Sequence, residues 1–396
     1  MKELLKEKKN FILLAYPLAL LLVILAKYVP GFAEYVWARG CYRMFRFVIA
    51  SVTGLLPFSL GEIVVIILGP TILFFLIRSV VRAVKRRKDH KALLTLMRTL
   101  RNFLIAVGLA LLAFTVNAGC NYYRDSIGVS LDLTVGDNNT EDLKNMCITL
   151  AGKAALARTE LEDKRISTWY DEPYGTEYKK VPVEEYENTI RTVPFESMYS
   201  NSERAQAARE AMKNLASEID ALWGAYPKPK SVMLSRLMSR FGITGIFFPF
   251  TVEANINVDT PDYTKGFVSC HELAHIGGFM REDEANFIAF LVCRTSGDEE
   301  LTYSGYMYAF EMAYNKLYKI SKEACEEVKE YVTQGMSADS HGDNEYWNEF
   351  REKELYKAGN TINDTYLKLN SQEDGTKSYG RMLDLLMALY RKDGDL

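Results

Sequence analysis

Long apolar stretches dominate the first 120 residues of this 396-residue chain, and a mixed, charged pattern follows them. Residues 11–29, 60–77 and 103–118 are nearly continuous apolar runs. With help from its flanks, each run can cross about 30 Å of hydrocarbon. We therefore expect a membrane domain with three transmembrane helices over residues 1–120 and a separate domain over residues 121–396.

Lysine and arginine are distributed unevenly around these runs. Four precede the first run, nine lie between the second and third, and three lie between the first and second. The positive-inside rule then places the N-terminus in the cytoplasm and the chain after about residue 119 on the outer side. We expect a multi-pass protein of the cell membrane, in contact with the lipid bilayer, whose C-terminal domain is extracytoplasmic. A cleaved signal peptide is the rival interpretation of the first run, but no clear small-x-small cleavage site follows it.

Residues 36–57, between the first two runs, allow two interpretations. Arg39, Arg43 and Arg46 recur at helical spacing among aromatic and aliphatic residues. This spacing favours an amphipathic helix in the membrane interface. An ordinary external loop is the equal alternative.

The pattern after residue 120 predicts mostly helices with a little extended structure. Loop and short extended pieces are expected over residues 164–201, and extended structure over 243–258, with Pro249 at an edge. The predicted fold class is therefore α+β, mostly helical. The expected helices cover residues 140–163, 203–223, 303–330 and 344–357, with a last helix after residue 381.

Composition excludes some classes of protein. The formal net charge of −3 gives no argument for nucleic acid binding, because the clustered basic residues flank the apolar runs. The six cysteines include no C-x-x-C pair, so neither a cysteine zinc site nor a disulfide scaffold is indicated. Cys270 is expected to be a small buried residue. A disulfide among the four cysteines from Cys147 onward is an open alternative if they face an oxidising compartment.

One pentapeptide, His271-Glu272-Leu273-Ala274-His275, carries candidate chemistry. In a helix from Ser269 to Gly277 its two histidines lie four residues apart on one face, where both can bind one metal ion. Glu272 beside them is the candidate catalytic base. The alternative is a structural helix with two hydrogen-bonded histidines.

The third metal ligand is expected on the next predicted helix, which follows a Gly-Gly turn. The candidates are Glu282, Asp283 and Glu284. Glu282 is preferred because Ala285 and Asn286 share its helical face: a small residue lets two helices approach, and a polar one can orient a liganding histidine. Glu284 stays open as the alternative. The predicted metal site is therefore His271, His275 and Glu282, holding Zn²⁺.

Two further features bear on catalysis. The extended segment 243–258, just before the histidine helix, could pair at its edge with an extended peptide; an ordinary core strand is the alternative. Hydrolysis also needs a donor for the developing oxyanion. The candidates, by chemistry alone and with a structural role as the alternative for each, are His341, Tyr303, Tyr306 and Tyr379.

HELAH, the Gly-Gly turn and EDEANFIAF together resemble the gluzincin class of zinc metallopeptidases, in which H-E-x-x-H is followed by a helix with E-x-x-A-D or E-x-x-A-N. The six-residue spacer between His275 and Glu282 is shorter than in most of that class. Over nearly its whole length the chain is also similar to an uncharacterised bacterial family with three N-terminal spans, HELAH, REDEANF, and C-terminal NDTYLK and SYGR. The resemblance implies a zincin-like fold and a peptidase activity, and nothing about substrate.

We therefore expect a membrane-anchored zinc metallopeptidase that cleaves a peptide or protein substrate at the outer side of the cell envelope. The rival is a non-enzymatic zinc-binding envelope sensor or scaffold. A third hypothesis is a zinc amidase that acts on cell-wall peptides.

Overall fold

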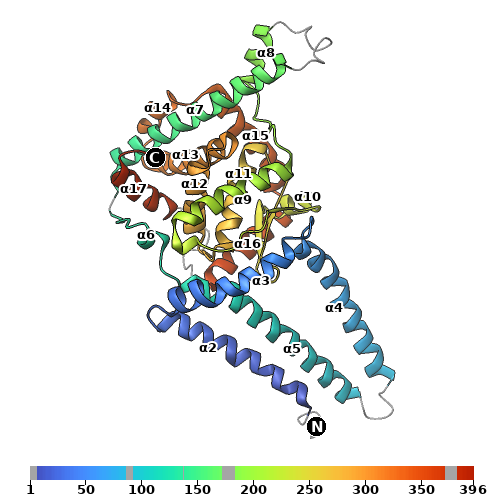
Figure 1. The fold of residues 1–396 in the computed structure, drawn as a ribbon. Coiled ribbons are helices and arrows are strands. Elements are labelled where there is room, and N and C mark those ends of the chain that lie inside the picture. The colour runs from blue at the N-terminus through green and yellow to red at the C-terminus, as the bar shows by residue number, and fades with distance from the viewer. Residues whose placement is uncertain (1–6, 86–91, 137, 172–182, 371–380) are drawn as a thin grey trace. The chain divides into compact units, whose positions relative to one another are not determined.

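The computed structural model describes residues 7–85, 92–136, 138–171, 183–370 and 381–396. They are mostly helical with one three-stranded sheet, so the predicted α+β, mostly helical class is confirmed (Figure 1). The chain divides into two compact units. One comprises Met1–Asp125 with Phe248–Glu253, and the other comprises Ser126–Phe247 with Ala254–Leu396.

The first unit contains three helices long and apolar enough to cross a membrane, Lys8–Tyr28, Leu60–Lys85 and Ala92–Asn117. They cover the three predicted runs to within one residue at the C-terminal end and indicate a multi-pass membrane protein. The second and third helices extend into the basic segment between the runs, because lysine and arginine favour helix as well as apolar residues do. The unit consists of η1 (Lys8–Leu14), α2 (Ala15–Tyr28), η2 (Phe32–Tyr42), α3 (Arg43–Thr53), α4 (Leu60–Lys85), α5 (Ala92–Asn117) and η4 (Gly119–Tyr123).

The segment over residues 36–57 is largely helical, so the external-loop alternative is wrong as to conformation. Its arginines do not form one simple polar face. Arg46 is 1% exposed, whereas Arg39 donates to Glu34 at 2.6 Å. The same Glu34 accepts a 2.9 Å hydrogen bond from Arg124. Placement of this helix in the membrane interface stays a prediction.

The second unit is helical around a small sheet. Its central helix α11 packs against α9, α12 and α13, and α13 packs in turn against α7. The helices are α6 (Ile127–Ser130), α7 (Thr140–Asp171), α8 (Val183–Ile190), α9 (Asn201–Glu218), η6 (Asp220–Leu222), α10 (Ser235–Arg240), α11 (Asp262–Ile276), α12 (Glu282–Thr295), α13 (Glu299–Ile320), α14 (Lys322–Lys329), α15 (Gln334–Arg351), α16 (Glu354–Leu369) and α17 (Met382–Asp393).

The prediction of loop and extended pieces over residues 164–201 is wrong for much of that segment. Helix α7 continues to Asp171, and α8 covers Val183–Ile190. In the sequence, Val183, Tyr186 and Ile190 recur at helical spacing. The prediction gave more weight to the proline and glycine content of the segment than to this spacing. Nearby, α9 begins with a capping box between Ser200 and Glu203, which fixes its start at Asn201.

The sheet supports the histidine helix that follows it in sequence. Strands β1 (Lys230–Ser231), β2 (Gly245–Phe248) and β3 (Glu253–Ile256) lie in the order β1-β3-β2, and β1 runs parallel to β3. Strand β2 is therefore an edge strand, and Pro249 directly follows it, as predicted. This edge lies in the chain shortly before the helix with the two histidines.

All six cysteines are free. Cys270 is fully buried, as predicted, and its Sγ lies 3.7 Å from that of Cys293 on the neighbouring helix α12. The open alternative of a disulfide among the later cysteines is thus not realised in this structure.

Candidate metal centre

The pentapeptide HELAH lies in the last turns of α11, as its spacing predicts. Asp262 stands in the first turn, where a carboxylate interacts favourably with the helix dipole. The helix ends at Ile276, and Gly278 takes a φ of +88°, a conformation that glycine adopts without strain. The rings of His271 and His275 consequently lie on one face, with centroids 4.6 Å apart.

Glu282 is the first residue of helix α12, and its carboxylate lies beside the two histidines. Glu282 Oε2 lies 3.3 Å from His271 Nε2, and Oε1 lies 3.7 Å from His275 Nε2. One ligand atom from each of the three residues lies within 4.8 Å of the others. The three side chains are each 10–13% exposed, so the group is largely buried. It is a group that could hold a metal ion.

Glu284, the alternative third ligand, points elsewhere. It is 1% exposed, and its Oε1 accepts a 2.9 Å hydrogen bond from the backbone N–H of Ile127 at the start of α6. Burial raises its pKa, and Arg281 opposes that rise. Asp283 likewise pairs with Arg281 at 2.8 Å and with Arg381 at 3.3 Å. Of the three acidic candidates, Glu282 alone joins the histidines.

Both histidines are held by hydrogen bonds at Nδ1. His271 Nδ1 lies 2.7 Å from Asn286 Oδ1, and His275 Nδ1 lies 2.7 Å from the carbonyl oxygen of Phe279. Each Nδ1–H can donate to its oxygen, which leaves the Nε2 lone pair to face Glu282. Ala285 is fully buried. The role inferred for Asn286 from the sequence, to orient a histidine, is seen in its hydrogen bond with His271.

Burial and neighbouring charges set the protonation of the histidines. Burial and the charge of His271 lower the pKa of His275 to about 4. For His271 burial acts in the same direction, but the hydrogen bond and charge of Glu282 outweigh it and raise its pKa. His275 is therefore neutral at neutral pH and can offer its lone pair to a cation.

Glu272 lies beside the histidines in an apolar setting. It is 4% exposed, and its Oε2 has no hydrogen-bond partner in the part of the chain that the structure describes. Burial raises its pKa to about 8, while the backbone N–H of Phe247 donates to the carboxylate and lowers it. Gly245 leaves room for the side chain: a Cβ at this position would lie 2.6 Å from Oε1. Strand β2 thus positions Glu272.

The candidates for an oxyanion donor lie away from this group or outside the described residues. Tyr303 donates to Asp339, and Tyr306 donates to the carbonyl of Leu396 at 2.9 Å. His341 is exposed on α15, 3.3 Å from Glu345. Tyr379 lies outside the described residues.

Tyr308, which sequence reasoning did not select, lies near the centre. Its ring stacks on Phe267 with centroids 3.7 Å apart, and Phe267 precedes His271 by one helical turn. Burial raises the pKa of Tyr308, and the charges of Glu282 and Glu311 raise it further. A neutral phenol can donate a hydrogen bond. The sequence contained no signal that α13 turns this tyrosine, rather than Tyr303 or Tyr306, toward α11.

Strand β2 also places an aromatic ring near the histidines. The ring of Phe247 lies 6.3 Å from that of His275. The centre thus joins two histidines and two glutamates from α11 and α12 with the edge of the sheet. This arrangement can bind a divalent cation and place a buried carboxylate beside it.

Residues 37–387 match DUF3810, a family described as a protein of unknown function. No curated protein and no solved structure matches the chain.

Proposed function

Because the chain belongs to the DUF3810 family of proteins of unknown function, we propose its function from the site itself: a membrane-anchored zinc-dependent metallopeptidase. The observation that carries this proposal is the buried Glu272 carboxylate, whose Oε2 has no partner among the described residues, next to the His271, His275 and Glu282 group. A carboxylate in this position is suited to take up and release a proton.

The ligand set fits zinc. Two imidazoles and one carboxylate are a common catalytic set for this metal, and ligands bound tetrahedrally at 2.0–2.1 Å lie roughly 3.3 Å apart. The 3.3 Å and 3.7 Å separations between Glu282 and the two histidines are close to that value. Zinc, when bound, supplies Lewis acidity, which makes water easier to deprotonate and polarises a carbonyl group.

Residues of the protein itself transfer the proton, hold the metal ligands and stabilise the developing charge. Glu272 accepts a proton from the attacking water and delivers it to the leaving amine, while Phe247 N–H fixes its orientation. Asn286 and the Phe279 carbonyl hold the imidazoles in place. Tyr308, whose ring stacks on Phe267 one helical turn before His271, is the proposed hydrogen-bond donor to the developing oxyanion.

A peptide is the substrate class that the surroundings favour. Strand β2 is an edge of the sheet and reaches both Glu272 and His275 through Phe247. An edge strand can bind an extended peptide by main-chain pairing, independent of its sequence. The distribution of lysine and arginine favours an outer location for this unit by the positive-inside rule, so we propose envelope peptides or proteins as substrates.

The test uses the full-length protein, purified in detergent. We expect about one zinc per chain by elemental analysis and cleavage products from a quenched-fluorescence peptide library. Glu272→Gln should keep the zinc and lower hydrolysis by about 10²–10⁴-fold. Absence of zinc from folded protein, or full activity of the variant, contradicts the proposal. A silent Glu272→Gln combined with loss of cellular function in His271→Ala indicates a non-enzymatic zinc module instead.

A further inference from the structure

The turn between β2 and β3, residues Phe248–Glu253, belongs to the first unit, whereas the rest of the sheet belongs to the second. Glu253 is fully buried, and its carboxylate accepts hydrogen bonds from the backbone N–H groups of Leu60 at 3.2 Å and Gly61 at 2.8 Å. The first N–H groups of a helix have no partner within the helix, and a carboxylate there also interacts favourably with the helix dipole. Glu253 thus attaches the β2–β3 turn to the first residues of α4.

The β2–β3 turn has a defined shape that fits against α4. A Cβ at Gly61 would lie 2.7 Å from Phe248 Cδ1, so the glycine makes room for the aromatic ring. The backbone N–H of Thr251 donates to the carbonyl of Phe248 at 3.3 Å and closes a turn with Pro249 in its second position, where the fixed φ of proline fits. Val252 is fully buried with a φ of +52°, which a β-branched residue adopts only where its surroundings hold it. The turn is therefore held in one conformation at the start of α4.

The length of the apolar run in α4 determines the depth of this attachment. At 1.5 Å per residue, the helical residues 60–77 span roughly 27 Å, close to the hydrocarbon thickness of about 30 Å. The run has little length to spare, so a membrane-spanning α4 places Leu60 at one boundary of the hydrocarbon. Only 6% of its apolar window is buried among the described residues, so most of the helix surface is open to lipid. The β2–β3 turn, attached at Leu60 and Gly61, lies at the same boundary.

Apolar side chains are exposed at this end of α4. Phe250 is 42% exposed, and its ring lies 5.3 Å from that of Phe248. Leu55 and Phe58, in the segment that precedes α4, are 83% and 41% exposed. Glu253 is the one ionisable side chain of the turn and is buried, so the turn presents no charge to its surroundings. Exposed phenylalanine and leucine without charge fit the boundary between lipid headgroups and acyl chains.

We propose that the β2–β3 turn is a lipid-contacting element, with Phe250 inserted into the bilayer interface where α4 enters the membrane. The partner is lipid because the exposed side chains continue the lipid-facing surface of α4 from its first residues. The chain therefore contacts the bilayer through a segment far in sequence from its three membrane helices. Strand β2, which positions Glu272, ends at Phe248 and so leads directly into this contact. The lipid contact itself does not depend on the proposed peptidase activity.

The test is photolabelling of the full-length wild-type protein in phosphatidylcholine vesicles. The vesicles contain a phosphatidylcholine with a diazirine in the upper part of one acyl chain, and peptide mass spectrometry locates the label. We expect label on Phe248–Glu253 as well as on α4, and none on Tyr318, an aromatic residue of α13 that is 48% exposed. Label on α4 without label on the turn overturns the proposal and favours a protein partner for Phe250. Equal labelling of the turn and Tyr318, or label on neither the turn nor α4, overturns it as well.

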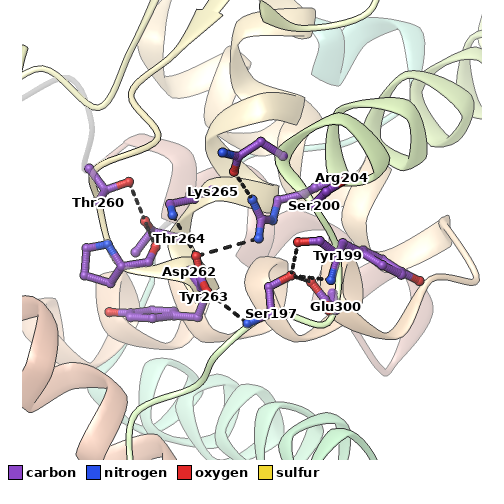
Figure 2. Close-up of polar contacts among 12 residues, drawn as sticks. Ser197, Tyr199, Ser200, Arg204, Thr260, Asp262, Tyr263, Thr264, Lys265 and Glu300 are labelled. Atoms are coloured by element: carbon purple, nitrogen blue, oxygen red, sulfur yellow. Dashed lines mark hydrogen bonds and ion pairs between the residues drawn. The ribbon is translucent and has the colours of Figure 1, made fainter. Parts of the chain in front are cut away.

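Two variants test the contact and its attachment separately. Phe250→Ser removes the inserted ring, and Glu253→Gln leaves one of the two backbone N–H groups without an acceptor, so each should lower labelling of the turn by about threefold to tenfold. Glu300→Gln is the matched control, because its buried carboxylate accepts the Met198 N–H at 2.8 Å and the Ser197 hydroxyl (Figure 2). Labelling of α4 should stay unchanged in all three. Undiminished labelling of the turn in Phe250→Ser, which changes only an exposed side chain, or equal labelling in Glu253→Gln and Glu300→Gln, contradicts the proposal.

Discussion

Asn286 Oδ1 lies 2.7 Å from His271 Nδ1, across the contact between α11 and α12. The contact fixes the ring of His271 with its Nε2 toward Glu282. Asn286→Ala should therefore weaken zinc binding by about 10- to 100-fold, measured by competition with a chelator. Asn286→Asp keeps an acceptor at the same position and should retain most of the affinity. Equal affinities of wild type and Asn286→Ala would show that the contact does not support the metal.

Substitutions of Glu282 and of Glu284 should have different effects, the first on zinc binding and the second on stability. Glu282→Gln removes a ligand charge, so zinc should be lost on dialysis. Glu284→Gln should keep zinc but lower the free energy of unfolding by about 1–3 kcal/mol, because its carboxylate is buried against the Ile127 N–H and Arg281. Elemental analysis and unfolding midpoints check both results. Loss of zinc in Glu284→Gln alone would mean that the third ligand is assigned wrongly.

Gly245→Ala tests whether β2 positions the base. The added Cβ would lie 2.6 Å from Glu272 Oε1 and 2.7 Å from Val268 Cγ1, so either the carboxylate or the strand must move. Displacement of a catalytic group by about 1 Å can cost on the order of 10²-fold in rate. We expect a loss of that size in peptide hydrolysis with zinc content unchanged. Gly152→Ala on α7, where a Cβ meets nothing within 4 Å, is the matched control.

Glu311 on α13 should make stability depend on pH. Burial raises its pKa to about 7, against hydrogen bonds from Ser340 and Tyr263, and the charge of Asp343 raises it further. The folded state therefore holds this proton more tightly than the unfolded chain does. Its contribution is full below about pH 4.5 and is lost as pH rises to about 7, so the free energy of unfolding should fall by about 1–3 kcal/mol across that window.

Glu311→Gln supplies the comparison for that pH dependence. The amide cannot ionise but can still accept from Ser340 and Tyr263. Unfolding midpoints measured from pH 5 to pH 8 should fall with rising pH in wild type and less steeply in the variant. The same slope in both proteins would show that another group titrates in this window.

Local patterns in the sequence were enough to predict the membrane helices and the two histidines of the candidate metal centre. Continuous apolar runs and four-residue spacing each describe a single segment, whose conformation depends little on the rest of the chain. The choice of Glu282 over Glu284 was also reached locally, from which residues share a helical face with each. The physical reason that Glu284 is withdrawn, the N–H of Ile127, lies 157 residues earlier in the chain.

The sequence alone did not show which face of each helix contacts which neighbouring element. Tyr303, Tyr306 and Tyr308 lie within six residues on α13, and chemistry alone does not distinguish them. Packing turns the first toward Asp339, the second toward Leu396, and the third toward Phe267 and α11. Such rotation about a helix axis is decided by tertiary contacts.

The turn after His275 has a consequence for how this centre can vary. Six residues separate His275 from Glu282, and the Phe279 carbonyl within them also holds His275. Adding or removing one residue here would change the span of the turn between α11 and α12 and would displace Glu282 relative to both histidines. The length of the turn therefore sets the position of Glu282 relative to the two histidines. It belongs to the ligand set as much as the three side chains do, and a change in its length should lower zinc binding.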